Sequence, residues 1–300
     1  MIQCYFLGEK NEDVNGLIEG TFDILDEFVE AFGKNADKNI NIIKEKISLL
    51  QISANNAPEF QIAMNLYDLA LNVHSRFLED DKNSYADILL RKAMKLKTGF
   101  EITSERCEEL IELFNKCLEI YYEEEENNKD QIQQAHRHLG MGCITIEYHD
   151  RIDVRMMHGR KTIKLEKEIY GGIRKNGRSG IENFFSLSTL GADICNNYYI
   201  DDYDYDYYMH EGTGYLLEAS AIVDSNPDVL STYPDVAAIT YYDLGYCEFK
   251  KEEKRNLRKA LDYVERGLLI LSKIDKTESI KRSIDSFKIL SRMINREIMI

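Results

Sequence analysis

The sequence predicts an all-α protein, and three observations support this fold class. The 300 residues contain only 3 prolines and 17 glycines, so long helices joined by short turns are expected. Apolar residues recur with a helical period in most segments, whereas no stretch shows the alternation of a half-buried strand. The chain is 44% hydrophobic, which is enough to bury a sizeable core in one elongated unit or in two domains.

Residues 1–55 are predicted to form an acidic helical pair that caps the N-terminal end of the fold. Leu17, Leu25 and Phe32 share an apolar stripe in the segment GLIEGTFDILDEFVEAF. The opening residues lack the basic start and apolar core of a signal peptide, and no window reaches the roughly 18 to 20 apolar residues of a membrane span. The six cysteines are scattered without C-x-x-C spacing, so reduced thiols and a cytoplasmic location are expected.

Residues 56–273 contain helical segments that recur in pairs. The clearest unit is AAITYYDLGYCEFKKEEKRNLRKALDYVERGLLIL, at residues 237–271. Small residues on its two helices allow the backbones to approach closely, and larger residues fill the groove between them. The packing residues of this unit and of two similar upstream fragments are Tyr241, Leu244, Gly245, Ala260, Val264 and Gly267; Leu190, Gly191, Gly212, Leu216 and Ala219; and Leu69, Ala86, Leu90 and Ala93.

This spacing resembles the tetratricopeptide repeat, in which an aromatic residue and a Leu-Gly pair on one helix meet small, bulky and small residues on the next. The resemblance implies antiparallel helix pairs stacked as a right-handed superhelix, that is, an α-solenoid. The chain departs from the family because its Leu-Gly pairs at 139, 190 and 244 are 51 and 54 residues apart, against about 34 in the family. The closing proline is also missing, and a generic helical bundle remains the alternative.

Residues 274–300 are predicted to form a single C-terminal capping helix. Asp275 and Glu278 fit a capping box at its start. Ile280, Phe287 and Ile294 share its apolar stripe, and its outer face is basic.

Charge is distributed unevenly along the chain. The net charge of -15 argues against nucleic acid as the main partner, because phosphate binding needs a basic face. Residues 179–249 hold 13 acidic residues and no Lys or Arg, whereas residues 151–178 hold nine Lys or Arg against three acids. We therefore expect a protein or peptide partner with basic segments. Residues 151–178 are one candidate, either in a second copy or folded across the groove of the same chain.

The stretch NNYYIDDYDYDYYMHEGTGY, residues 196–215, begins the predicted partner-binding face. Residues 198–208 are expected to connect two helices, and 11 of the 19 tyrosines lie in the segment without Lys or Arg. Tyrosine provides rigid contact area and aspartate sets the sign of the electrostatic potential. Packing of the tyrosines against their own repeat is the alternative. The predicted face comprises Tyr199, Asp202, Tyr203, Asp204, Tyr205, Asp206, Tyr208, Tyr242 and Tyr246.

No metal or cofactor is expected. Asp202, Asp204 and Asp206 match the first ligands of an EF-hand loop, but Tyr207 stands where that loop needs Gly and Thr213 where it needs Glu. The Gly-rich, basic stretch YGGIRKNGRSG lacks the Gly-Lys-Ser/Thr ending of a P-loop. We interpret it as a flexible turn, with anion binding through backbone N–H groups as the alternative.

Two further functional hypotheses stay open beside a non-catalytic binding module. The spacing of Arg151 and His158 in RIDVRMMH resembles the R-x4-6-H pattern of HEPN ribonucleases, which implies that the two residues act at a scissile phosphate. Ile152 departs from the polar residue that commonly follows the Arg. The chain also resembles peptide-sensing tetratricopeptide regulators of bacteria. Residues 1–60 hold eleven acids against five Lys and show no helix-turn-helix, so such a regulator would act through another protein.

Overall fold

The computed structural model describes residues 36–57, 59–98, 104–142, 152–197, 205–251 and 255–299. Every secondary-structure element in these ranges is a helix, which confirms the all-α prediction for them. In chain order the helices are α3 (Ala36–Asn56), α4 (Phe60–Phe77), α5 (Lys82–Thr98), α6 (Ser104–Tyr122), α7 (Lys129–Gly142), α8 (Ile152–Tyr170), α9 (Gly177–Asn197), α10 (Tyr205–Ser225), α11 (Pro227–Thr232), α12 (Pro234–Lys250), α13 (Leu257–Leu271) and α14 (Glu278–Ile298).

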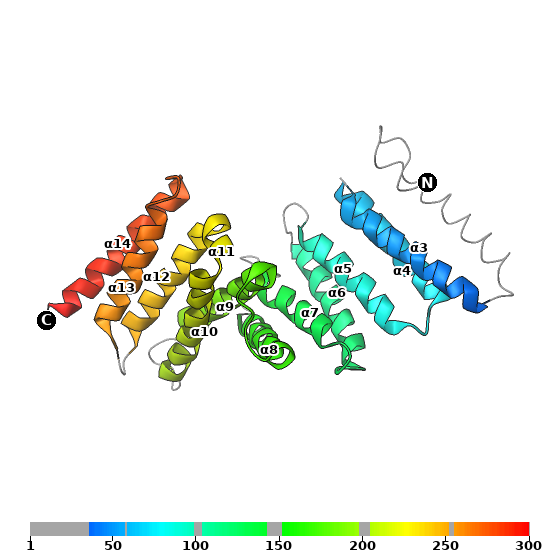
Figure 1. Ribbon diagram of the computed structural model, residues 1–300, viewed down its shortest axis with the longest axis horizontal. Helices are drawn as coiled ribbons and strands as arrows, with labels where there is room; N and C mark the ends of the chain where they lie inside the picture. Colours follow the sequence, from blue (N-terminus) through cyan, green and yellow to red (C-terminus); the bar gives the residue numbers. More distant parts are fainter. Residues whose placement is uncertain are drawn as a thin grey trace. The chain divides into compact units, whose positions relative to one another are not determined.

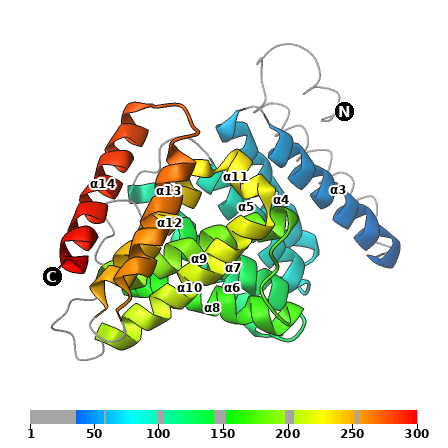
Figure 2. The ribbon, with the colours of Figure 1, turned by 60° about the vertical axis from the view of Figure 1, so that its left-hand side comes forward.

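The chain divides into two compact units, Met1–His138 (unit 1) and Leu139–Ile300 (unit 2). Within each unit, neighbouring helices pack in pairs. In unit 1, α3 lies against α4, and α5 against both α4 and α6. In unit 2, α9 packs between α8 and α10, and α12, α13 and α14 lie side by side (Figures 1 and 2). The predicted limits at residues 55 and 273 fall at the end of α3 and between α13 and α14; the division into cap, repeats and capping helix stays a prediction.

Unit 1 has a core of large side chains whose polar ends are satisfied. Tyr67 and Tyr121 are fully buried, and their hydroxyls donate to Asn55 Oδ1 at 2.7 Å and to Asp87 Oδ1 at 2.6 Å. Burial of a tyrosine ring is favourable when its hydroxyl keeps a partner, so these bonds let the two rings sit in the core. The predicted packing residues of this unit, Leu69, Ala86, Leu90 and Ala93, are also buried, on α4 and α5.

Glycines bring α9 and α10 into close contact. A Cβ atom on Gly191 would lie 2.7 Å from Leu216 Cγ and 2.8 Å from the carbonyl oxygen of Gly212. A Cβ atom on Gly212 would in turn lie 2.6 Å from Cys195 Sγ and 2.9 Å from the carbonyl oxygen of Gly191. Real Cβ atoms do not approach other atoms so closely, so glycine is required on both helices at this crossing. Leu190, Leu216 and Ala219 are buried beside it.

The same arrangement joins α12 to α13 and α13 to α14. A Cβ atom on Gly245 would lie 2.7 Å from Val264 Cγ2 and 3.0 Å from the carbonyl oxygen of Ala260. On α13, the open side of Gly267 is filled by the Phe287 ring of α14, 2.2 Å from where a Cβ would be. The aromatic and leucine of this unit, Tyr241 and Leu244, are buried, as are Ala260 and Val264. We call these crossings the glycine seams.

The start of α14 differs from the predicted capping box. The N-cap residue is Thr277, whose Oγ1 accepts a hydrogen bond from the Ile280 backbone N–H at 3.3 Å. Asp275 lies outside the helix, and its carbonyl oxygen accepts from the Thr277 N–H at 2.9 Å. Threonine and aspartate both cap helices well. Because Asp275 and Thr277 lie only two residues apart, the sequence alone did not decide which of them is the N-cap.

In the part of the chain that the structure describes, no helix combines the length and the apolarity needed to cross a membrane.

Two glycine-to-alanine substitutions in unit 2 test the glycine seams. Gly191→Ala should lower the free energy of unfolding by about 1–3 kcal/mol, because its methyl group has no room beside Leu216 and Gly212. Gly214→Ala on α10 should raise it by about 0.5–1 kcal/mol, because nothing lies within 4 Å of the added atom and alanine favours helix. Urea unfolding followed by circular dichroism measures both. Equal changes in the free energy of unfolding for the two variants would contradict the close helix packing at Gly191.

Candidate partner-binding face in unit 2

The predicted connector is shorter than expected. Tyr199, Asp202, Tyr203 and Asp204 lie outside the described residues, and α10 begins at Tyr205. Tyr205, Asp206 and Tyr208 therefore belong to the first turn of a helix, and not to a connector that ends at residue 208. Asp206 is favourable there because a helix N-terminus carries partial positive charge.

The expectation that Tyr205 faces a partner is wrong. Its side chain is 5% exposed and its hydroxyl donates to the carbonyl oxygen of Lys250 at 3.2 Å, so it ties α10 to the end of α12. Burial raises the pKa of Tyr205 to about 12. Tyr208 is half-buried against the core of unit 2. The most exposed tyrosine of this turn is Tyr207, which is 66% exposed and meets the edge of the Tyr208 ring.

Two predicted tyrosines form an aromatic ladder on α12. The rings of Tyr242 and Tyr246 are half-buried and stack at 6.4 Å between centroids with an angle of 7° between planes. Phe287 of α14 packs against Tyr242 at 5.0 Å, and Lys250 Nζ lies 5.6 Å from the centre of the Tyr246 ring. A lysine of the chain itself therefore makes a cation–π contact with this ladder.

The basic helix α8 pairs with the acidic helices of its own chain. Arg160 donates two hydrogen bonds of 2.8 Å to the carboxylate of Glu211 on α10. Lys167, two helical turns further, binds Glu218 at 2.9 Å. These contacts supply within one chain the charge pairing that we also considered for a second copy.

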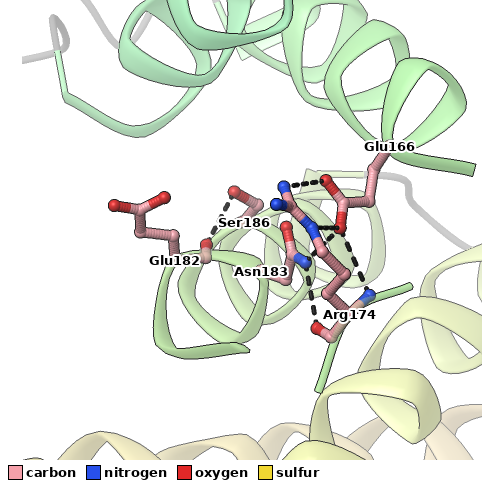
Figure 3. A network of polar contacts seen from close by, with 5 residues as sticks. All are labelled: Glu166, Arg174, Glu182, Asn183 and Ser186. Carbon is pink, nitrogen blue, oxygen red and sulfur yellow. Dashed lines mark hydrogen bonds and ion pairs between the residues drawn. The ribbon is translucent and has the colours of Figure 1, made fainter. Parts of the chain in front are cut away.

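A buried carboxylate, Glu166, organises the turn between α8 and α9 (Figure 3). It is fully buried and accepts from Arg174 Nε at 2.8 Å and Nη2 at 2.9 Å, and from Asn183 Nδ2 at 2.7 Å. The Arg174 guanidinium also lies 3.5 Å above the centre of the Tyr170 ring. A charge taken out of water is tolerated only when hydrogen bonds replace its hydration, and this network provides them.

The Gly-rich stretch between these helices binds an anion that belongs to the chain. The backbone N–H of Arg174 donates to Glu166 Oε1 at 3.2 Å. Gly171 and Gly177 adopt φ angles of 68° and 58°, which favour glycine. The turn that we interpreted as flexible is therefore closed around the Glu166 side chain.

Asp243 on α12 is a buried carboxylate of a different kind. It is 9% exposed, and among the described residues none forms a hydrogen bond or an ion pair with it. Burial, with a smaller contribution from the nearby Asp193, raises the pKa of Asp243 from 3.8 to about 7. Asp193 lies on α9 and is bound by Arg155 of α8.

Nearby, Ser188 of α9 and Thr240 of α12 share a buried hydrogen bond of 2.7 Å that holds the two helices together.

The residues of the ribonuclease hypothesis are placed as follows. Arg151 lies outside the described residues. His158 is buried on α8, and burial lowers its pKa, so the ring is neutral at physiological pH. A buried histidine is poorly placed to exchange protons with a polynucleotide substrate. The Arg–His pair stays a prediction.

A cavity of about 500 Å³ in unit 1 was not anticipated from the sequence. It lies between the start of α3, the α4–α5 connection and the end of α6. Two of its carboxylates are paired, Asp81 with Lys44 at 2.7 Å and Glu123 with Lys82 at 2.7 Å. Because three separate segments line it, no single stretch of sequence indicates the cavity.

No protein-family model matches the chain, and a search of curated proteins gave no match. Within the described ranges, no group of three or more His, Cys, Asp or Glu side chains is arranged to hold a metal ion.

Glu166→Gln tests the buried network. Loss of the charge leaves the Arg174 guanidinium without its carboxylate, so the free energy of unfolding should fall by about 2–4 kcal/mol. Glu182→Gln is the matched control, because the Glu182 side chain is 36% exposed and pairs with an exposed Arg178; its effect should stay within about 0.5 kcal/mol. Chemical denaturation at neutral pH compares them. A stable Glu166→Gln variant would contradict the role given to the network.

Asp243→Asn tests the buried carboxyl through its pH dependence. The folded state holds the Asp243 proton up to about pH 7, whereas the ordinary pKa is 3.8. The contribution of this group therefore lowers the stability of the folded protein as pH rises from about 4 to about 7. At pH 8 the free energy of unfolding of the variant should therefore exceed that of the wild type by roughly 2–4 kcal/mol. This difference should become smaller toward about pH 5. The exposed Asp262→Asn on α13 should change little at either pH.

Proposed function

We propose that this chain is a non-catalytic binding module in which tetratricopeptide-like helix pairs present an acidic, tyrosine-bearing face to a basic or extended segment of another protein. The observation that carries the proposal is the half-exposed Tyr242–Tyr246 ladder on α12, within a segment of 71 residues that lacks Lys and Arg. Peptide-binding surfaces combine rigid aromatic area with charge complementary to the ligand.

The glycine seams support the repeat architecture in this proposal. They place Leu-Gly on the first helix of a pair against a small residue on the second, at Gly191 with Gly212 and at Gly245 with Ala260. Stacking such pairs as an α-solenoid would set α9 and α12 beside each other as first helices, which agrees with the bond between Ser188 and Thr240.

The internal ion pairs narrow the part of the face that is open to a partner. Glu211 and Glu218 are engaged by α8, and Tyr205 is buried. We therefore place the proposed partner contact at Tyr242, Tyr246 and the acidic residue between them on α12, Asp243. The module serves as a scaffold or a regulatory subunit, according to the partner that it holds.

A peptide-display library tests this function. The wild-type chain should enrich sequences rich in Lys and Arg, and Tyr242→Leu and Tyr246→Leu should each lower the affinity of an enriched peptide by about tenfold. Leucine keeps apolar bulk in the fold but removes the ring. Leu269→Ala, at a position of α13 that is 58% exposed, serves as the control and should leave the affinity unchanged. Enrichment of no peptide, or of acidic peptides, would refute the proposal.

A further inference from the structure

We infer that Asp243 is the specificity-determining residue of this face, and that it pairs with one Arg or Lys side chain of the bound partner. The inference rests on the proposed function and names the chemistry that its ligand must carry. It starts from a carboxylate that is 9% exposed and has no hydrogen-bond or ion-pair partner among the described residues. Buried charges in proteins are ordinarily paired, so an unpaired one requires an explanation.

Three described cations near α9 and α12 are already engaged. Arg155 binds Asp193, and Lys251 binds Glu248 at 2.8 Å in a pair that is itself buried. Lys250 has its ammonium over the Tyr246 ring. Residues 179–249 contain no Lys or Arg, so the segment that surrounds Asp243 has no cation of its own to offer.

Asp243 lies on the same helix as the ladder, and 9% of its surface is exposed. It lies three residues before Tyr246, so these two side chains are neighbours on the helix surface, and it follows Tyr242 directly in sequence. Burial, and after it the negative charge of Asp243, raises the pKa of Tyr242. A side chain that enters along the two rings would bring its charged end to the carboxylate, with its aliphatic stem on the aromatic surface.

The surrounding groups favour an organic cation over a metal ion. The titratable groups around Asp243 are Asp193 on α9, with Arg155 of α8 bound to it, Tyr242 and Cys247 on α12, and Tyr205 of α10 beside Cys247. Calcium and magnesium require about six oxygen ligands, and one free carboxylate beside an engaged one falls short. A guanidinium or ammonium group needs one carboxylate and an apolar wall.

Proton linkage follows from the raised pKa of Asp243. The carboxyl has a pKa of about 7 in the folded chain, so a cation must displace its proton below that pH. Affinity for the partner should therefore fall by about tenfold from pH 8 to pH 6, because the deprotonated fraction falls by about that factor. Without the Asp243 carboxyl, this pH dependence should disappear.

A double-mutant cycle with an enriched library peptide tests the inference. The peptide is synthesised with each Arg replaced in turn by citrulline, and each Lys by norleucine, which removes the charge and keeps the stem. For one position, the replacement should weaken binding to the wild type by tenfold or more, and binding to Asp243→Asn by less than about twofold. Asp262→Asn, an exposed carboxylate on α13, should retain the full wild-type discrimination.

The outcomes separate the two proposals. If a peptide binds but every replacement costs the same in wild type and Asp243→Asn, the role of Asp243 is refuted and the binding function stands. If no peptide binds the wild type, the binding function fails and this inference fails with it. Should Asp243→Asn not fold, the wild-type affinity between pH 6 and pH 8 decides, because a flat profile also refutes the role of Asp243.

Discussion

The close approach of paired helices at the glycine seams is the constraint on which the rest of unit 2 depends. Gly191 and Gly212 each leave room for the backbone of the other helix, and Gly245 does the same for α13. With any larger residue at these crossings, the helices would separate and the buried residues between them would lose contact. The seams thereby fix the positions of α9 and α12, which carry Asp193 and Asp243.

Many of the acidic side chains in unit 2 form ion pairs with basic side chains of the same chain. Arg160 and Lys167 of α8 bind Glu211 and Glu218 of α10, and Glu166 is enclosed by Arg174. The strong acidic bias of residues 179–249 is therefore partly balanced within the fold. Among the described residues of this segment, Asp243 is a buried carboxylate that has no ion pair. We propose that such a face would select its ligand by one specific cation more than by bulk electrostatic attraction.

Sequence patterns predicted the features that depend on helix geometry alone. Small residues such as Gly191 and Gly245 recur at fixed spacings from Leu and aromatic residues, so the periodicity and the close contacts can be anticipated together. Tyr205 was misplaced because the start of α10 depends on packing against α12, which no local pattern encodes. Asp243 counted as one acid among 13 in its segment, because its burial depends on α9 and not on its neighbours in sequence. The unit 1 cavity and the Glu166 network likewise join residues from separate segments.

Nuclear Overhauser contacts between the paired helices give the most direct test of the seams. In a sample with labelled glycine, leucine and valine, the Gly191 Hα protons should show cross-peaks to the Leu216 methyl groups. The Gly245 Hα protons should show them to the Val264 methyl groups. Gly214, which has no neighbour within 4 Å of its open side, should show no such long-range cross-peaks. Absence of the first two sets of cross-peaks would contradict the paired-helix account.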